Sequence, residues 1–462
     1  MASIPPFDAN LLRRYDKPGP RYTSYPTAPQ FVEGFGEGEF REAAERSNAD
    51  PIPRRLSVYA HIPFCFSPCF YCGCNRVITR DKSRGDAYLS RLVREVALVA
   101  PLFDRDRDVI QVHLGGGTPN FLSSGQLEEL IDSLGQHFHF SASPKRDFSI
   151  ELDPRCVGPA DIAALAGMGF NRASLGVQDF DPAVQEAVNR VQSVAETLAV
   201  IDACRSYGFR SVNVDLIYGL PRQNRDGFAT TLDIVTAARP DRLAIYSYAH
   251  LPQMFRAQRQ IDAALLPNPE DKLGLLQLAI EKLSEAGYRY VGMDHFALPE
   301  DELSQAQENG GLHRNFMGYT THAESDLIGL GVSAISHIGD TYSQNPRDLP
   351  SWERAIDAGR LPVWRGMQLD ADDIVCADAI QQLMCQGAID IVAMERRHEI
   401  EFDSYFSTSL ERMASLVADG LVEITPARIQ ATSRGRLLLR IIAGCFDRYL
   451  PQATPARFSK AI

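Results

Sequence analysis

The sequence predicts an α/β fold: a partial (β/α)6 TIM-like barrel with an N-terminal arm and a mostly helical, winged-helix-like C-terminal domain. Three observations predict it. Six short apolar runs are typical of buried parallel strands, helical repeats lie between several of them, and polar or glycine residues stand where the runs end. A doubly wound open sheet is the structural alternative. We place the arm at residues 1–50, the barrel with its extension at 51–365, and the C-terminal domain at 366–462.

The arm is rich in proline, glycine and aromatic residues, as in YDKPGPRYTSYPTAPQF. Residues that favour turns predict an extended segment without a core of its own. Tyr15, Tyr22, Tyr25 and Phe31 make it too aromatic for a merely solvated tail, so we expect it to pack on the barrel mouth.

The strand-like runs follow one another in chain order. They are residues 57–63, 109–117, 147–154, 171–178, 211–221 and 242–252. Glu151, Gln178, Asp215 and the glycines at 115–117 stand at or near their ends. Because the loops that follow barrel strands surround one mouth, we expect the active site there.

Beyond residue 270 the pattern is helical, with one more strand-like run at 288–297. Near the C-terminus, a helix around 407–419 precedes LVEI and RIQAT, which form a predicted hairpin, and RGRLLLRIIAGCFDRYL, a predicted final helix. The formal charge of −12 argues against a nucleic-acid partner. We therefore interpret this winged-helix-like unit as a lid or packing domain rather than a DNA-binding one.

Several features predict a cytoplasmic protein without a membrane span. No apolar run approaches the roughly 20 residues that cross a bilayer, and the first residues, MASIPPFDAN, do not resemble a secretory signal. Nine cysteines, four of them within residues 65–74, indicate a metal or catalytic site rather than a disulfide scaffold. Cys204 lies on the apolar face of a predicted helix, and we expect it to be a core thiol.

Cys65, Cys69 and Cys72 have C-x3-C-x2-C spacing immediately after the first predicted strand. Thiolates are soft ligands that suit zinc or an iron–sulfur cluster. Three thiolates can bind three irons of a cubane and leave the fourth iron open. A zinc site normally draws its ligands as two separated pairs, and free catalytic thiols would not require three cysteines. We therefore favour a [4Fe–4S] cluster over zinc, and zinc over free thiols.

This loop, followed one strand later by GGGTP (115–119), resembles the radical S-adenosylmethionine (SAM) superfamily. The resemblance implies that SAM chelates the open iron and is cleaved to methionine and a 5′-deoxyadenosyl radical. Glycines let backbone groups approach a ligand closely, which suits the triplet for SAM binding.

Longer motifs resemble the oxygen-independent coproporphyrinogen III oxidase family across nearly the whole chain. They are the arm, the CGC of residues 72–74, GVQDF (176–180), VNRVQ (188–192), DLIYGLP (215–221), YAHLP (248–252), GMDHFA (292–297), HRNFMGYTT (313–321) and GVSAIS (331–336). The resemblance implies oxidative decarboxylation of two propionates of coproporphyrinogen III to vinyl groups, giving protoporphyrinogen IX. Met317 stands where some members carry Gln, which weakens any polar contact to SAM from that position.

The resemblance also implies site residues and two bound SAM molecules. Tyr59, Gly116, Glu151 and Ile335 would contact the cluster-bound SAM. Tyr71, Gly117, Thr118, Gln178, Arg190, Asp215 and Ala249 would contact the second SAM. Tyr59 and Cys74 are the candidate catalytic residues, and Cys74 is not expected to bind iron.

The substrate carries four carboxylates, so a local basic pocket is expected despite the acidic total. Arg13, Arg14, Lys17, Arg21 and Arg314 are the predicted propionate contacts. We expect a monomer that takes electrons from a low-potential donor such as flavodoxin or ferredoxin. The competing functions are a haem-trafficking relative, a radical methyltransferase acting on haem and, outside enzymes, a zinc-stabilised interaction protein.

Overall fold

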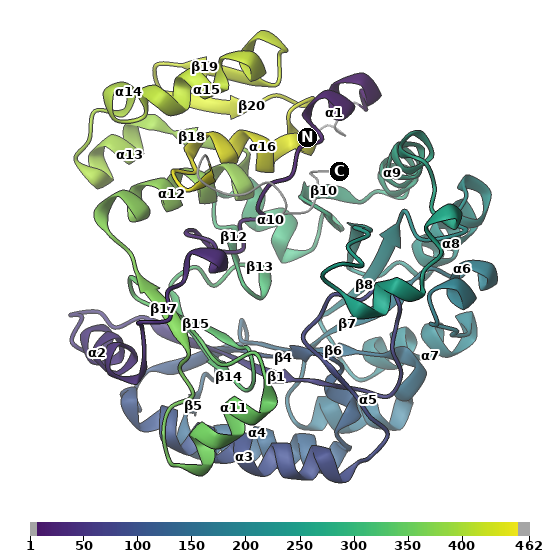
Figure 1. Cartoon of the computed structure of the whole chain (residues 1–462), viewed down its shortest axis with the longest axis vertical. Helices are drawn as coiled ribbons and strands as arrows, with labels where there is room; N and C mark the ends of the chain where they lie inside the picture. Colours follow the sequence, from purple (N-terminus) through teal and green to yellow (C-terminus); the bar gives the residue numbers. More distant parts are fainter. Residues whose placement is uncertain (1–6, 451–462) are drawn as a thin grey trace.

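The computed structural model describes residues 7–450 (Figure 1). Residues 1–6 of the predicted arm and 451–462 of the predicted C-terminal domain lie outside the described residues. Within the described part, no helix combines the length and apolar character needed to span a bilayer.

Six parallel strands form the centre of the large sheet. They are β1 (Arg55–Ile62), β4 (Asp108–Gly116), β6 (Asp147–Leu152), β7 (Arg172–Gln178), β8 (Ser211–Tyr218) and β9 (Arg242–Ser247). They neighbour one another in chain order, without the reversal of a doubly wound sheet. Val58, Val112 and Val214 are completely buried, as parallel strands covered on both faces require. The predicted partial barrel is confirmed, and the described strands do not close it.

Helices between these strands cover the outer side of the sheet (Figure 1). They are α3 (Ser83–Val99), α4 (Ser124–His137), α5 (Pro159–Gly167), α6 (Pro182–Ala187), α7 (Val194–Ser206), α8 (Arg225–Ala238) and, after β9, α9 (Pro269–Glu285). The side chain of Ser123 caps α4, where it accepts a hydrogen bond from the amide of Gln126. Leu92 and Val96 of α3 are fully buried against the sheet, and so is Cys204 of α7, the predicted core thiol.

The sheet continues beyond β1 in a way that the sequence did not predict. β14 (Ser325–Leu330) runs parallel to β1, and β15 (Ile335–Ile338), β16 (Thr341–Gln344) and β17 (Arg365–Gln368) follow it antiparallel. Two elements precede β14 in the chain: α10 (Glu302–Glu308) and the hairpin of β12 (His313–Asn315) and β13 (Gly318–Thr320). Between β16 and β17 lies α11 (Leu349–Asp357).

The single strand predicted at 288–297 is wrong. This run forms an antiparallel hairpin of β10 (Arg289–Gly292) and β11 (His295–Ala297), and β11 pairs with β9. Gly292 and Met293 have positive φ angles of 156° and 54°, so the chain turns there instead of continuing.

The sequence predicted an extended arm, but the arm contains two helices, α1 (Ala9–Tyr15) and α2 (Glu37–Asn48). α2 begins with a capping contact in which the amide of Gly36 donates to Glu39. Tyr15, Tyr22 and Tyr25 are buried in one core with the C-terminal residues. Figure 1 shows the purple arm leaving the C-terminal unit and crossing to α2.

The C-terminal part is a helical unit with a small sheet. Its elements are α12 (Ala371–Gln386), β18 (Ala388–Asp390), α13 (Ile391–His398), α14 (Phe402–Tyr405), α15 (Ser407–Ala418), β19 (Val422–Thr425), β20 (Arg428–Ala431) and α16 (Leu439–Ala443). The predicted helix near 407–419 and the hairpin are present, and β18 adds a third strand. The predicted final helix is wrong in length, because only α16 is α-helical, with 3-10 turns on both sides. The predicted boundary at 365/366 falls inside β17.

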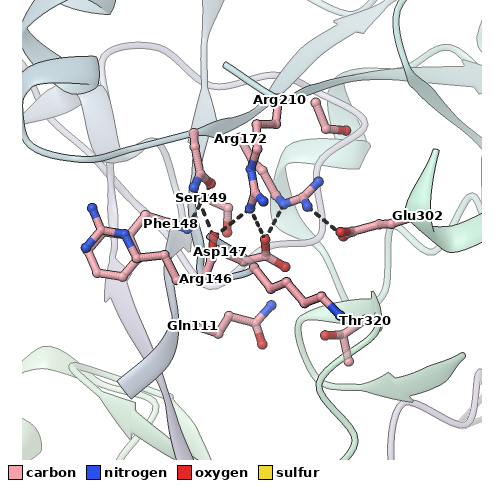
Figure 2. A network of polar contacts seen from close by, with 12 residues as sticks. Gln111, Arg146, Asp147, Phe148, Ser149, Arg172, Arg210, Glu302 and Thr320 are labelled. Atoms are coloured by element: carbon pink, nitrogen blue, oxygen red, sulfur yellow. Dashed lines mark hydrogen bonds and ion pairs between the residues drawn. The ribbon is translucent and has the colours of Figure 1, made fainter. Parts of the chain in front are cut away.

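A buried ion network lies where the parallel strands begin (Figure 2). Asp147, the first residue of β6, accepts hydrogen bonds from Arg172 (2.7 Å), Arg210 (2.8 Å) and His322 (3.0 Å). Arg172 also pairs with Glu302 at 2.7 Å. Every charge in the network has a partner of opposite sign, as burial requires. This end of the sheet is therefore held together by ion pairs.

Candidate active site at the strand ends

The three predicted cluster cysteines lie on one loop that begins where β1 ends. Cys65 ends β2 (Phe64–Cys65), which pairs with β3 (Val77–Ile78). The amide of Cys72 donates to the carbonyl of Cys69 (3.3 Å), and Arg76 donates to the carbonyls of both residues, each at 3.1 Å. These contacts fold the loop back on itself, so the three thiols share one compact segment.

Two guanidinium groups lie against Cys69. Nη1 of Arg190 is 3.4 Å from Sγ of Cys69, and Nη2 of Arg155 is 3.8 Å from it. Asp153 orients both arginines, accepting from Arg190 at 3.3 Å and from Arg155 at 2.6 Å. Two guanidinium groups and the carboxylate of Asp153 thus surround the Cys69 sulfur.

The other thiols have different surroundings. A hydrogen bond with the Cys74 side chain is the main cause that lowers the pKa of Cys72 to about 6, whereas burial raises the pKa of Cys65 to about 12. Within residues 7–450, no three His, Cys, Asp or Glu side chains form a group that could hold a metal ion. Three thiols that each reach a different iron of a cubane need not converge on one point. Cys72 and Cys69 lie close enough to act on the pKa of Cys65, so one loop presents three soft ligands of the kind that a [4Fe–4S] cluster takes.

The glycine triplet packs tightly against the start of the cysteine loop. The amide of Gly117 donates to the carbonyl of Ile62 at 2.8 Å. A Cβ on Gly117 would lie 2.7 Å from the carbonyl oxygen of Phe64, and one on Gly116 would lie 2.8 Å from the ring of His61. Only glycine fits at these two positions, because they pack against the backbone at residues 63–64 and against the ring of His61.

Tyr59, Glu151 and Ile335, three predicted contacts of the cluster-bound SAM, stand on β1, β6 and β15 of one sheet, with β4 and β14 between them. The Glu151 carboxylate accepts from the amide of Gly116 (3.1 Å), and hydrogen bonds and nearby histidines outweigh its burial and lower its pKa. Tyr59 pairs in register with Gly329, and a Cβ on Gly329 would lie 2.5 Å from the carbonyl oxygen of Ile335. The structure brings these residues to one side of the mouth.

Asp215 and Gln178 lie on β8 and β7. Asp215 accepts hydrogen bonds from Ser174 (3.0 Å) and Asn213 (2.9 Å), but burial raises its pKa to about 6. Gln178 ends β7 with a positive φ of 70°, which turns the backbone away from the strand. Both positions agree with the expected site at the carboxyl ends of the strands.

Tyr71, Ala249, Thr118 and Arg190 complete the predicted set for the second SAM. A buried glutamine, Gln258, donates to the carbonyls of Tyr71 (2.9 Å) and Ala249 (3.2 Å) and so brings two loops together. Thr118 donates its amide to Phe64 (2.9 Å). Nε of Arg190 is buried without an acceptor, as expected of a group that awaits an anion such as a SAM carboxylate.

The five predicted propionate contacts separate into two groups. Arg13 and Arg14 form surface ion pairs with Glu270 (3.4 Å) and Asp419 (2.9 Å). Lys17 is exposed. Arg21 pairs with Asp294, and Arg314 is buried. The structure brings only Arg21 and Arg314 together, since each lowers the pKa of His295 along with burial.

Sequence reasoning missed Tyr246, His295, Gln258 and Arg440. The rings of Tyr246 and His295 meet edge to face at 6.0 Å, between Arg21 and Arg314. Arg440 of α16 donates to the carbonyl of Gly19 in the arm. Two of these residues had a signal in the sequence: His295 lies within the GMDHFA motif, and Tyr246 stands two residues before the YAHLP motif. Nothing in the local sequence distinguishes Arg440 from other helical arginines.

Comparison with known proteins gives one consistent result. A family model described as the Radical SAM superfamily matches residues 59–235. The oxygen-independent coproporphyrinogen III oxidase of Pseudomonas aeruginosa is 50% identical over 456 residues, which covers 99% of both chains. The enzyme of the same name from Escherichia coli K12 is 46% identical over 457 residues, covering 99% of this chain and 98% of that one.

A solved structure agrees with these sequences. The coproporphyrinogen III oxidase of Escherichia coli, described as a radical SAM enzyme, superposes with a TM-score of 0.91 at 44% identity, covering 97% of this chain and 100% of that one. The cysteine loop, the glycine triplet and the strand-end residues lie within the matched length. The chain therefore belongs to the oxygen-independent coproporphyrinogen III oxidase family of radical SAM enzymes.

Proposed function

We propose that this protein converts coproporphyrinogen III to protoporphyrinogen IX without oxygen, using a [4Fe–4S] cluster and SAM. The observation that carries the proposal is the 50% identity over essentially the whole length to an oxidase of this name. The haem-trafficking, methyltransferase and zinc-protein alternatives have no comparable support.

The side chains divide the work by their chemistry. Cys65, Cys69 and Cys72 would hold the cluster, and Arg190 and Arg155 lie beside the sulfur of Cys69. When bound, the cluster and SAM supply the electron and the 5′-deoxyadenosyl radical that removes a hydrogen atom from the propionate β-carbon. That C–H bond is not acidic, so no side chain of the site could act on it as a base.

The strand-end residues hold and orient the cofactor. Tyr59, Gly116, Glu151 and Ile335 would contact the cluster-bound SAM, and the set around Arg190 and Asp215 would contact a second SAM. Arg190 suits a carboxylate, and Asp215 suits a hydroxyl or an ammonium group. Each propionate loses one hydrogen atom, one electron and CO2 to become a vinyl group, so the reaction also needs an electron acceptor. Cys74, in contact with Cys72, is the candidate for a further role in catalysis.

We also propose a monomer that acts in the cytoplasm and receives electrons from a flavodoxin or ferredoxin. All nine cysteines lie in the described part of the chain, and none forms a disulfide. Reduced thiols are typical of a cytoplasmic protein.

The test is an anaerobic assay. The purified protein is reconstituted with iron and sulfide and incubated with SAM, a low-potential reductant and coproporphyrinogen III, with Cys69→Ala as the control. We expect 5′-deoxyadenosine and protoporphyrin to form together in the wild type and neither to form in the control. Deoxyadenosine without protoporphyrin would point to a haem-binding or methyltransferase relative, and zinc without either product would refute the proposal.

A further inference from the structure

Three arginines from distant parts of the chain meet beside the barrel mouth. Arg21 comes from the arm, Arg314 from β12 and Arg440 from α16. Arg440 donates to the carbonyl of Gly19, next to Arg21 in the arm. Burial, followed by the charges of Arg314 and Arg440, lowers the pKa of Arg21 to about 10, so the three cations lie close enough to repel one another.

Aromatic rings connect two of these guanidinium groups. The guanidinium carbon of Arg21 lies 5.6 Å from the ring centre of Tyr246, and that of Arg314 lies 4.7 Å from the ring centre of Tyr319. The ring of His295 contacts both tyrosines, at 6.0 and 5.2 Å. Burial and the neighbouring arginines lower the pKa of His295 well below its ordinary value, so this histidine is neutral and leaves the positive charge uncompensated.

The balancing negative charge is incomplete at one of the three arginines. Asp294 pairs with Arg21, and Asp16 acts on Arg440. Arg314 is only 5% exposed, and its Nε and Nη1 atoms are buried without an acceptor. Burying a charged group with unpaired donors is costly unless an anion completes it. This arginine is therefore built for a ligand that the protein does not itself supply.

The arginines border the site where the reaction takes place. Tyr246 lies on β9 beside β8, the strand of Asp215. Its pKa is raised by burial and by Asp215 and Glu151, and lowered by Arg21 and Arg314, so all four charges lie around one ring. Arg314 also lines a cavity of about 1210 Å³, which none of the predicted SAM contacts lines. Arg314 is thus in contact with space that the described residues leave open.

We propose that Arg314, with Arg21 and Arg440 beside it, is an anchoring site for a propionate carboxylate of the porphyrinogen, so that the arm and the C-terminal unit both take part in substrate binding. The inference rests on the proposed function. Arg440 adds a residue from the C-terminal unit, which the sequence had suggested was only a lid or packing domain. A guanidinium suits a carboxylate because it can donate two parallel hydrogen bonds.

The test measures binding apart from turnover. Coproporphyrin III, the stable oxidised form of the substrate, is titrated into the reconstituted holoenzyme, and its fluorescence is followed. We expect Arg314→Gln and Arg21→Gln to bind it roughly 10- to 100-fold more weakly, since each loses a charge-assisted contact. Arg314→Lys should recover part of the affinity. Arg239→Gln, whose side chain pairs with Glu300 on the surface, should bind as the wild type does.

A second readout separates anchoring from a structural role. In the variants we expect a higher KM for coproporphyrinogen III and the same KM for SAM as in the wild type. Affinity within twofold of wild type in both Gln variants would overturn the inference. If Arg314→Gln fails to fold, the partly exposed Arg21 decides alone. If the variants bind coproporphyrin III more weakly but the wild type forms no protoporphyrin, the carboxylate site is retained and the proposed function is refuted. If the wild type forms protoporphyrin but the variants bind as tightly as it does, the proposed function is retained and the carboxylate site is refuted.

Discussion

Replacing Asp147 by Asn should strongly destabilise the protein. Asp147 is 3% exposed and accepts hydrogen bonds from Arg172 and Arg210 (Figure 2). It also accepts one from His322. The amide of Asn is nearly the same size but carries no charge, so the variant leaves the cations without their common partner. Breaking a buried ion pair by removing one partner costs about 3–5 kcal/mol.

The pKa of Asp147 gives a second value for its contribution to the free energy of unfolding. Burial raises its pKa, but His322 and Arg172 more than offset burial and lower the pKa from 3.8 to about 2. That difference corresponds to roughly 2 kcal/mol of stability in favour of the charged form. Because the folded-state pKa is the lower one, this contribution is present above pH 3.8 and is lost as the pH falls toward 2. The two values bracket an effect of about 3 kcal/mol at neutral pH.

Urea unfolding at pH 7, followed by circular dichroism, measures the effect. The matched control is Asp357→Asn, because Asp357 also accepts from two arginines, Arg91 and Arg94, but lies on the surface with 43% of its side chain exposed. Solvent screening makes that pair weak, so the control should unfold close to the wild type. Equal shifts of the urea midpoint in the two variants would refute the reasoning, and so would a wild-type advantage that persists unchanged to pH 2.

Three further predictions concern the site. Gly117→Ala would place a methyl group 2.7 Å from the carbonyl oxygen of Phe64, and we expect roughly 100-fold slower formation of 5′-deoxyadenosine, because the cofactor is misplaced. Arg190→Lys loses the forked contact to Asp153, and we expect a KM for SAM roughly tenfold higher. Glu95→Gln removes an acceptor from a buried carboxyl that holds three donors, and we expect about 1–3 kcal/mol lower stability in urea unfolding.

Each of these variants has a matched control. Gly125→Ala lies on α4, where a Cβ meets nothing within 4 Å, and should keep normal activity. Arg225→Lys changes an arginine that is 56% exposed and should not alter the KM for SAM. Glu129→Gln, on the exposed face of α4, should leave stability unchanged. A variant of the site that behaves like its control would show that the corresponding contact is not needed.

The central strands were predictable because their signal is local. Each of the six runs carries its own apolar pattern, and the observed strands β1, β4, β6, β7, β8 and β9 begin within two residues of the predicted runs. β14 was not predictable, because it forms a strand only through its pairing with β1. Ser325 lies beside Arg55, 270 residues earlier in the chain, and no periodicity near residue 325 indicates that pairing. The hairpin of β10 and β11 was hidden inside one apolar run by a turn at Gly292.

The candidate site follows the same division. The cysteine loop and the glycine triplet are compact motifs: the spacing of the cysteines favours a cluster, and the family resemblance implies SAM at the glycines. The basic site beside the mouth is assembled from the arm, β12 and α16, so its members could be named only by residue type. That criterion selected Arg13 and Arg14, which the structure places in surface ion pairs, and overlooked Arg440, which contacts the arm. Charge identifies candidates, whereas tertiary structure decides which of them face one ligand.

The two ends of the parallel strands treat charge in opposite ways. At the amino ends, Asp147 and Arg172 are satisfied by partners within the protein, and Arg107 pairs with Asp326 at 2.7 Å with both side chains buried. At the carboxyl ends, Arg190 pairs with Asp153 but keeps its Nε buried without an acceptor, and Arg314 of β12 keeps two such nitrogens. Closed ion pairs add rigidity but offer nothing to a ligand, whereas open donors destabilise the empty protein and bind an anion when one arrives. Stability and function are therefore separated along the strand axis, and Asp147→Asn should weaken folding while the protein that remains folded still cleaves SAM.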